Sequence, residues 1–122
     1  MDHSNEFQAL VDDAKSRIAE CTIDDVLERQ ERGARFRLID VREDDEWRAG
    51  HARGAEHIGR GVLERDIVAN APDKSEELIL YCGGGFRSAL AADNLVRMGY
   101  RRVFSLAGGW REWNKRGLPT EK

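Results

Sequence analysis

One stretch in the second half of the chain constrains the fold most, because a short apolar block leads through three glycines into a helical pattern. The block Leu78–Tyr81 is continuously apolar rather than alternating, which favours a parallel strand buried on both faces. Cys82 follows this strand, and a helix is predicted to begin directly after the glycine turn. In open α/β sheets, ligands bind at the carboxyl ends of the strands. The pattern therefore places Cys82 at a ligand-binding edge of a parallel sheet.

The surroundings of Cys82 favour its thiolate form over the neutral thiol. The backbone amides of Gly83, Gly84 and Gly85 can turn inward around a small group. The amino end of the following helix adds a partial positive charge, and Arg87 adds a full one. A cysteine in such a setting is a nucleophile at neutral pH. The alternative is an inert core cysteine, but that role does not require three glycines after it.

The size of the loop narrows the chemistry. Four residues separate Cys82 from Arg87, and Ser88 stands at the sixth position after the cysteine. The cysteine phosphatases place five residues between their cysteine and arginine, which encloses a whole phosphate. The smaller ring of amides in this chain suits one extra sulfur atom on Cys82.

The stretch from Cys82 to Ser88 resembles the active loop of the rhodanese family of sulfurtransferases, and three further motifs extend the resemblance. They are Leu38–Arg42 followed by Glu46-Trp47, then Gly50–Ile58, and finally Leu106–Trp110 with Trp113. Ala52-Arg53 stands where the family more often has Ile-Pro. The motifs occur in the family's order between Thr22 and Pro119.

The resemblance implies a rhodanese-like single domain of the α/β class, with a mainly parallel β-sheet flanked by helices on both faces. The alternation of strands and helices along the chain independently predicts this architecture. We expect the domain to cover residues 22–122 and an N-terminal helical extension to cover residues 1–21. An amphipathic helix is predicted over residues 5–20, with Cys21 at its junction with the next helix. This helix packs on its own domain, pairs with a second subunit or meets a partner, and the first of these is the expectation. Further strands are expected over residues 36–41, 54–58 and 103–106.

The resemblance also implies a function and a set of site residues. Cys82 is the expected catalytic residue, and the expected substrate-binding residues are Gly83, Gly84, Gly85, Phe86, Arg87 and Ser88. The chain is then an enzyme, a sulfurtransferase that moves a sulfane sulfur from thiosulfate, mercaptopyruvate or a persulfide to a thiophilic acceptor. The sulfur travels as a Cys82 persulfide, and neither a metal nor an organic cofactor is required. The expected partners are a small anionic sulfur donor and a thiol or cyanide acceptor, with a sulfur-accepting protein as a further candidate.

The sequence leaves the donor and the role of Arg87 open. Many thiosulfate-using relatives carry a basic residue where Gly83 stands. Mercaptopyruvate-using relatives often begin the loop with Cys-Gly-x-Gly, as Cys82–Gly85 do, but usually carry threonine at the position of Arg87. The Arg87 side chain either receives the anionic donor or braces the turn by pairing with an acid such as Asp40.

Other polar residues near the same sheet edge are expected to support the site. Asp40 and Arg42 stand at the carboxyl end of the strand over residues 36–41, where they are expected to brace neighbouring loops. His51 and His57 are candidates for a general base for Cys82, but persulfide chemistry on a low-pKa thiolate needs no base. Because a histidine beside a glycine turn usually hydrogen-bonds the backbone, we expect that role for both. Cys21 lacks a charged cradle and is expected to fill space.

Two functions of other classes stay open. One is a persulfide-relay or redox-regulated protein-interaction module with little small-molecule turnover. The other is a phosphatase or arsenate-type enzyme of the same fold, which the short loop disfavours. A sulfur-transfer assay run beside a phosphatase assay distinguishes these functions.

The composition describes a globular protein without features of nucleic-acid or membrane binding. The 122 residues carry a formal charge of −3, and acids and bases are interspersed, as in Arg29–Arg32. Two cysteines make no disulfide framework, and no Cys/His spacing matches a zinc site. No apolar run approaches the length of a membrane span, and Met1–Glu6 lacks the regions of a signal peptide. We therefore expect a cytoplasmic location.

Overall fold

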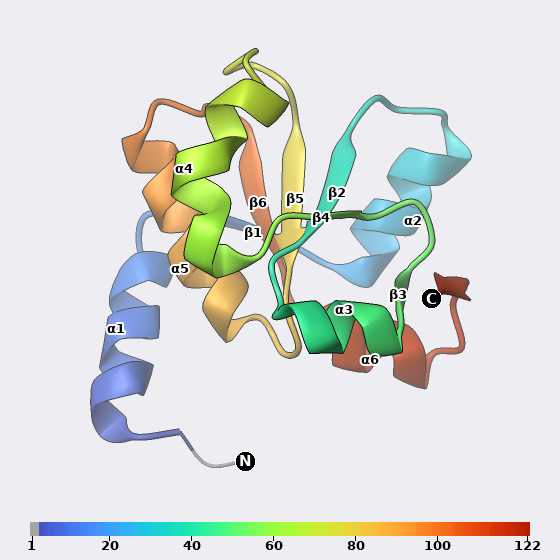
Figure 1. Cartoon of the computed structure of the whole chain (residues 1–122), viewed down its shortest axis with the longest axis horizontal. Coiled ribbons are helices and arrows are strands. Elements are labelled where there is room, and N and C mark those ends of the chain that lie inside the picture. Colours follow the sequence, from blue (N-terminus) through green and yellow to red (C-terminus); the bar gives the residue numbers. More distant parts are fainter. Residues whose placement is uncertain (1–2) are drawn as a thin grey trace.

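β5 (Leu78–Tyr81), the strand that leads to Cys82, is the central strand of a five-stranded parallel sheet in the computed structural model, which describes residues 3–122 (Figure 1). The strand order is β1-β6-β5-β2-β4, and β3 pairs with β7 in a separate antiparallel ribbon. The other strands are β1 (Ala19–Cys21), β2 (Arg37–Asp40), β3 (His51–Ala52), β4 (Glu56–His57), β6 (Val103–Leu106) and β7 (Thr120–Glu121). The predicted α/β class with a parallel sheet is confirmed.

Two helical layers cover the sheet, and Figure 1 shows them on opposite sides. Leu78 and Leu80 of β5 pack in the core beneath α4 and α5, whereas Ile79 and Tyr81 pack in the core beneath α2 and α6. These four residues are at most 1% exposed, so the continuous apolar run reflects burial on both faces. The helices that cover the sheet and its edge are α2 (Ile23–Glu31), α3 (Asp44–Ala49), α4 (Arg60–Asn70), α5 (Phe86–Arg97) and α6 (Gly109–Lys115).

Glycines set both ends of α5, the helix that follows the cysteine. The turn after β5 enters α5 through Gly85, whose φ of +102° lies in the left-handed region that favours glycine. Gly99, with the same φ, follows the last turn of the helix. The helix between them has 12 residues.

No helix in the described part of the chain is long and apolar enough to cross a membrane.

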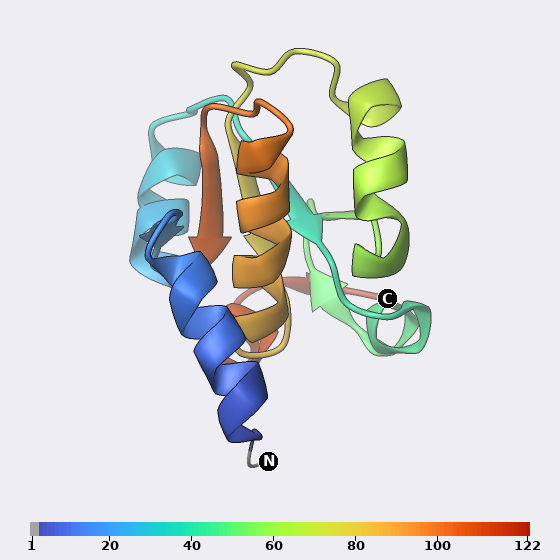
Figure 2. The ribbon, with the colours of Figure 1, turned by 90° about the vertical axis from the view of Figure 1, so that its left-hand side faces the viewer.

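α1 (Asn5–Lys15) lies alongside α5 (Figure 2) and packs through Val11 and Ala14 against Ala89 and Leu90. Its amino end lies at the same end of the molecule as the turn between β5 and α5, as both views show. The predicted amphipathic helix is therefore present and docked on the domain.

The carboxyl end of that predicted helix is wrong, because residues 19–21 form the strand β1. β1 pairs in parallel with β6, with Cys21 opposite Leu106. Cys21 thus ends an edge strand and does not lie at a junction of two helices. The strand is only three residues long, and helical periodicity that continues to Ile18 hides it. The boundary between an extension over residues 1–21 and a domain over residues 22–122 stays a prediction.

Candidate active site

The Cys82 sulfur lies inside the turn between β5 and α5, and the residue is only 1% exposed. Three donors reach Sγ: the Gly85 N–H at 3.2 Å, the Ser88 N–H at 3.3 Å and the Ser88 hydroxyl at 3.5 Å. The amides belong to the turn and to the first residues of α5, so the positive end of the helix faces the sulfur. The turn can therefore hold a sulfur anion through its backbone.

These contacts lower the pKa of the Cys82 thiol. Burial is the largest influence and by itself would raise the pKa, because a thiolate loses its solvation in an apolar core. The Ser88 hydroxyl and the backbone amides of Ser88, Gly85 and Gly84 act in the opposite direction and outweigh burial. Cys82 therefore carries thiolate at pH values where an ordinary cysteine is neutral.

The hydroxyl of Ser88 is held in turn by Ser105 of the neighbouring strand β6. The two Oγ atoms lie 2.8 Å apart, and both residues are fully buried. A hydroxyl has one hydrogen to donate, so Ser105 must donate to Ser88 whenever Ser88 donates to the sulfur. Sequence reasoning missed Ser105, although a serine within the apolar strand Val103–Leu106 was an available signal.

The start of α6 fixes the other side of the turn. The Trp110 N–H donates to the Cys82 carbonyl oxygen at 2.7 Å, and the Arg111 N–H donates to the Gly83 carbonyl oxygen at 3.0 Å. Gly109 has a φ of +47°, and a Cβ at this position would overlap the Cys82 carbonyl oxygen. Glycine at this position lets α6 approach the turn this closely.

Arg87 forms a two-point ion pair with Glu46 of α3, with N···O distances of 2.8 and 3.1 Å. The hydrogen bonds between them lower the pKa of the Glu46 carboxyl and raise the pKa of the Arg87 guanidinium. The acid that pairs with Arg87 is thus Glu46, while Asp40, the partner considered from the sequence, pairs with Arg42. A Cβ on Gly83 would lie 3.3 Å from Arg87 Nη2, so the guanidinium also lies beside the turn.

Asp40 and Arg42 form a buried pair. Arg42 Nε and Nη2 donate to the Asp40 carboxylate at 3.1 and 2.8 Å. Asp40 is 0% exposed and Arg42 is 3% exposed. Arg42 Nη2 also donates to the Gly50 carbonyl oxygen at 2.7 Å. The Arg42 guanidinium carbon lies 4.8 Å from the centre of the Trp110 ring. The pair therefore braces the segments that carry α3 and α6.

The two candidate histidines contact backbone carbonyl groups. His51 Nδ1 lies 3.0 Å from the Trp47 carbonyl oxygen, and its ring stacks on the Trp47 ring with centres 3.4 Å apart. His57 Nε2 lies 2.8 Å from the Arg42 carbonyl oxygen. Both histidines thus have the backbone partners that the sequence predicts.

Cys21, the second cysteine, differs from Cys82 in its electrostatics. It is 3% exposed, and burial raises the pKa of its thiol to about 12. It lies in the core beneath α2 and α6, so it stays a neutral thiol at physiological pH.

A cavity of about 480 Å³ adjoins Cys82. Besides residues of the turn, four side chains that sequence reasoning missed line it: His3, Phe7, Glu46 and Arg111. Arg111 lies over Gly84, since a Cβ on that glycine would lie 3.2 Å from Arg111 Nη1. The available signal for Arg111 was its position directly after the Gly-Gly-Trp motif, which the fold brings to the turn.

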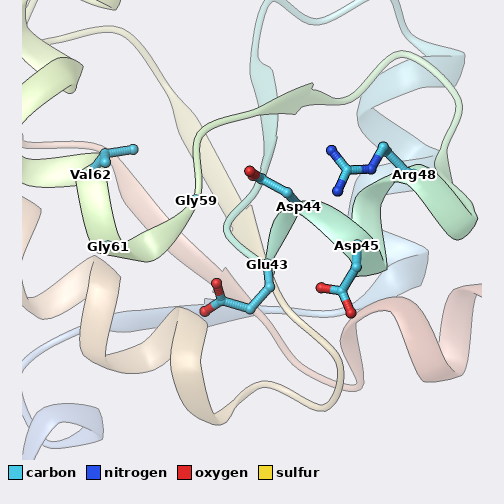
Figure 3. Close-up of a pocket in the computed structure, with 7 residues that line it drawn as sticks. All are labelled: Glu43, Asp44, Asp45, Arg48, Gly59, Gly61 and Val62. Atoms are coloured by element: carbon cyan, nitrogen blue, oxygen red, sulfur yellow. The ribbon is translucent and has the colours of Figure 1, made fainter.

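A second hollow lies between α3 and the start of α4 (Figure 3). Its lining residues are Glu43, Asp44, Asp45, Arg48, Gly59, Gly61 and Val62. Although it is acidic, no group of three or more His, Cys, Asp or Glu side chains among residues 3–122 is placed to hold a metal ion. None of its lining residues is a cysteine, serine, threonine or lysine, and Cys82 does not line it.

The comparisons with known proteins agree with this geometry. The model of the rhodanese-like domain family matches residues 22–116. Thiosulfate sulfurtransferase GlpE of Coxiella burnetii is 32% identical over 76 residues, which cover 62% of this chain and 69% of that protein. The YrkF protein of Bacillus subtilis, a candidate sulfur carrier, is 29% identical over 98 residues. That alignment covers 80% of this chain and 52% of YrkF, so the chain spans about half the length of that relative.

Two solved structures resemble nearly the whole chain. A protein of unknown function from Rhodopseudomonas palustris, named as a possible tyrosine phosphatase, is 30% identical with a TM-score of 0.84, over 99% of this chain and 98% of that one. The polysulfide-sulfur transferase homodimer of Wolinella succinogenes is 28% identical with a TM-score of 0.79, over 95% of this chain and 87% of that one. Since the family model matches most of its length, the chain belongs to the rhodanese-like domain family.

Proposed function

We propose that this chain is a rhodanese-type sulfurtransferase, in which Cys82 accepts a sulfane sulfur from a donor and passes it to a thiophilic acceptor. The observation that carries the proposal is the convergence of three hydrogen-bond donors on Cys82 Sγ. The same donors suit a bound persulfide, because amides at a helix amino end stabilise an anion. Family members named thiosulfate sulfurtransferase and polysulfide-sulfur transferase support this chemistry.

The first half-reaction loads Cys82. With thiosulfate, the thiolate attacks the sulfane sulfur, a new S–S bond forms, the S–S bond of the donor breaks and sulfite leaves with the electron pair. With mercaptopyruvate, the thiolate attacks the thiol sulfur and the carbon–sulfur bond breaks. Pyruvate then leaves after its carbon takes up the thiol proton.

The second half-reaction unloads Cys82. Cyanide or an acceptor thiolate attacks the outer sulfur of the persulfide, and the bond between the two sulfur atoms breaks. Thiocyanate or a new persulfide leaves, and the electron pair returns to Cys82 as thiolate. The sulfur is carried covalently throughout, so this scheme needs no cofactor.

The residues from Gly83 to Ser88 hold the reacting sulfur atoms in this proposal. Gly85 and Ser88 supply the amides that already contact Sγ, and Phe86 and Arg87 line the cavity. Because Glu46 compensates the charge of Arg87, we assign Arg87 chiefly to bracing the turn. The positions of Gly83 and Gly84 let the guanidinium groups of Arg87 and Arg111 approach the backbone.

Phosphate-ester hydrolysis is the competing function, because one similar structure is named as a possible tyrosine phosphatase. Two features disfavour it in this chain. The turn is short, with four residues between Cys82 and Arg87. Arg87 is also paired with Glu46 through both terminal nitrogens, which leaves less of its charge for a phosphoryl group.

The test is a thiocyanate-forming assay with thiosulfate and with mercaptopyruvate as donors, run beside a phosphatase assay with an aryl phosphate. We expect turnover with at least one sulfur donor and none with the phosphate ester. Cys82→Ser should lose the activity, and Cys21→Ser should keep it. Phosphate release that depends on Cys82, without thiocyanate formation, would replace the proposal with a phosphatase.

A further inference from the structure

The cavity beside Cys82 is larger than the transfer of one sulfur atom requires. Its volume of about 480 Å³ falls in the range of about 300–1,000 Å³ that is typical of sites for organic small molecules. The lining comes from the turn itself, from α3 and α6, and from the N-terminal segment that precedes the family match. The cavity thus offers a donor contacts well beyond the reacting sulfur.

One contact is a cation that has no counter-ion among residues 3–122. The Arg111 side chain forms neither an ion pair nor a hydrogen bond with any of residues 3–122, whereas Arg87 is neutralised by Glu46. A Cβ on Gly84 would lie 3.2, 3.5 and 3.6 Å from Arg111 Nη1, Cζ and Nη2, so the guanidinium lies against the turn two residues after Cys82. An uncompensated guanidinium binds carboxylate or sulfonyl oxygens through two parallel hydrogen bonds. Arg111 is therefore the group best placed to receive the anionic part of a donor.

The other contact is a cluster of aromatic rings. The Phe86 ring centre lies 4.4 Å from that of His3 and 6.1 Å from that of Phe7, and His3 and Phe7 are 5.0 Å apart. All three residues line the cavity, and Phe7 and Phe86 are half-buried. Because α1 packs along α5, the first turn of α1 is held against Phe86. An apolar or aromatic group gains by burial against such rings.

We propose that the preferred donor is an organic anion, in which a charged group beside the sulfane sulfur is joined to an apolar body. Arg111 binds the charged group, and Phe7 and Phe86 contact the body. Inorganic thiosulfate uses only the first of these contacts. The inference rests on the proposed sulfurtransferase function and gives α1 a role in donor selection.

Two thiosulfonates probe this specificity, because they carry the same charge and the same reacting S–S bond. Methanethiosulfonate has a methyl body, and benzenethiosulfonate has a phenyl body. In both, the Cys82 thiolate attacks the sulfane sulfur, the S–S bond of the donor breaks and a sulfinate leaves with the electron pair. The quantity measured is the ratio of kcat/KM for the phenyl donor to kcat/KM for the methyl donor, since intrinsic reactivity cancels when variants are compared.

Phe7→Ala should lower this ratio about tenfold, the effect expected for losing an aromatic contact. Leu10→Ala is the matched control, since Leu10 lies on the same helix, is 56% exposed and is not part of the Cys82 cavity. Leu10→Ala should leave the ratio unchanged. If Phe7→Ala fails to fold, Phe7→Leu keeps the packing of α1 and should lower the ratio about threefold. An unchanged ratio in the folded variants would overturn the apolar part of the proposal.

Arg111→Gln should lower kcat/KM for both thiosulfonates alike, by about tenfold, and Arg111→Lys should restore part of the loss. Arg116→Gln, at the other end of α6, is the control and should have no such effect. Unchanged kinetics in Arg111→Gln would overturn the anion-binding role. Failure of the wild-type protein to load with thiosulfate, with mercaptopyruvate and with both thiosulfonates would instead refute the proposed function itself.

Discussion

Removing the Ser88 hydroxyl is expected to raise the pKa of the Cys82 thiol. The pH profile of the rate at which Cys82 is alkylated should then cross the profile of the wild type. The substitution Ser88→Ala deletes the donor at 3.5 Å but leaves the amides of Gly85 and residue 88 in place. It would also leave the buried Ser105 hydroxyl without its partner. The variant is therefore made together with Ser105→Ala.

The size of the effect follows from the hydrogen bond that is lost. A hydrogen bond to a charged group contributes about 1.5–3 kcal/mol, and the long O···S distance favours the lower end. A loss of about 1.4 kcal/mol lowers the thiolate population about tenfold at pH values below the pKa. A more basic thiolate is also a better nucleophile, with a Brønsted coefficient of about 0.4–0.5, which recovers about threefold. The net expectation is alkylation about threefold slower at low pH and about threefold faster at high pH.

The assay is alkylation with iodoacetamide over a pH series, with each cysteine followed by peptide mapping. Cys21 is an internal reference, because burial raises the pKa of its thiol to about 12 and it should react slowly in both proteins. Cys82 should be alkylated preferentially at low pH in the wild type, since its pKa is lowered. Parallel profiles without a crossing would mean that only access to Cys82 had changed, and identical profiles would refute the donation by Ser88.

Two further predictions concern the scaffold of the turn. Gly109→Ala should destabilise the fold by about 2–4 kcal/mol, because its Cβ would overlap the Cys82 carbonyl oxygen. Thermal melting measures this loss. Gly61→Ala is the control, because a Cβ on Gly61 meets nothing within 4 Å. Equal melting temperatures would show that α6 does not approach the turn so closely. Glu46→Gln should release the charge of Arg87 and lower KM for thiosulfate about two- to fivefold at low salt, with the gain lost at high salt. Steady-state kinetics at two ionic strengths measure this, and a raised KM would mean that Glu46 orients Arg87 toward the donor.

The strand, turn and helix around Cys82 could be predicted because their signals are local. A continuous apolar block, three glycines and a helical pattern follow one another within residues 78–92. The positions of Asp40 and Arg42 at the end of a strand could be predicted in the same way, whereas the hydrogen bonds between the two side chains are known from the structure. Short-range sequence patterns predict such features well when the segment is long enough, whereas the three-residue strand β1 was hidden by a helical pattern beside it.

The rest of the site could not be read from the sequence, because it depends on contacts between distant segments. Arg87 and Glu46 are 41 positions apart, and either residue has several alternative partners of opposite charge nearby in the sequence. Arg111 enters the site only because α6 docks on the turn through Trp110 and Gly109. Phe7 enters it only because α1 packs along α5, which an amphipathic pattern alone does not specify.

The most direct test of the central claim is the intact mass of the protein after incubation with thiosulfate or mercaptopyruvate and removal of the donor without reductant. We expect the wild-type protein and Cys21→Ser to gain the mass of one sulfur atom, and cyanide to remove it. Cys82→Ser should gain nothing. A sulfur adduct that persists in Cys82→Ser, or no adduct on the wild-type protein with either donor, would contradict the account of Cys82 as the sulfur carrier.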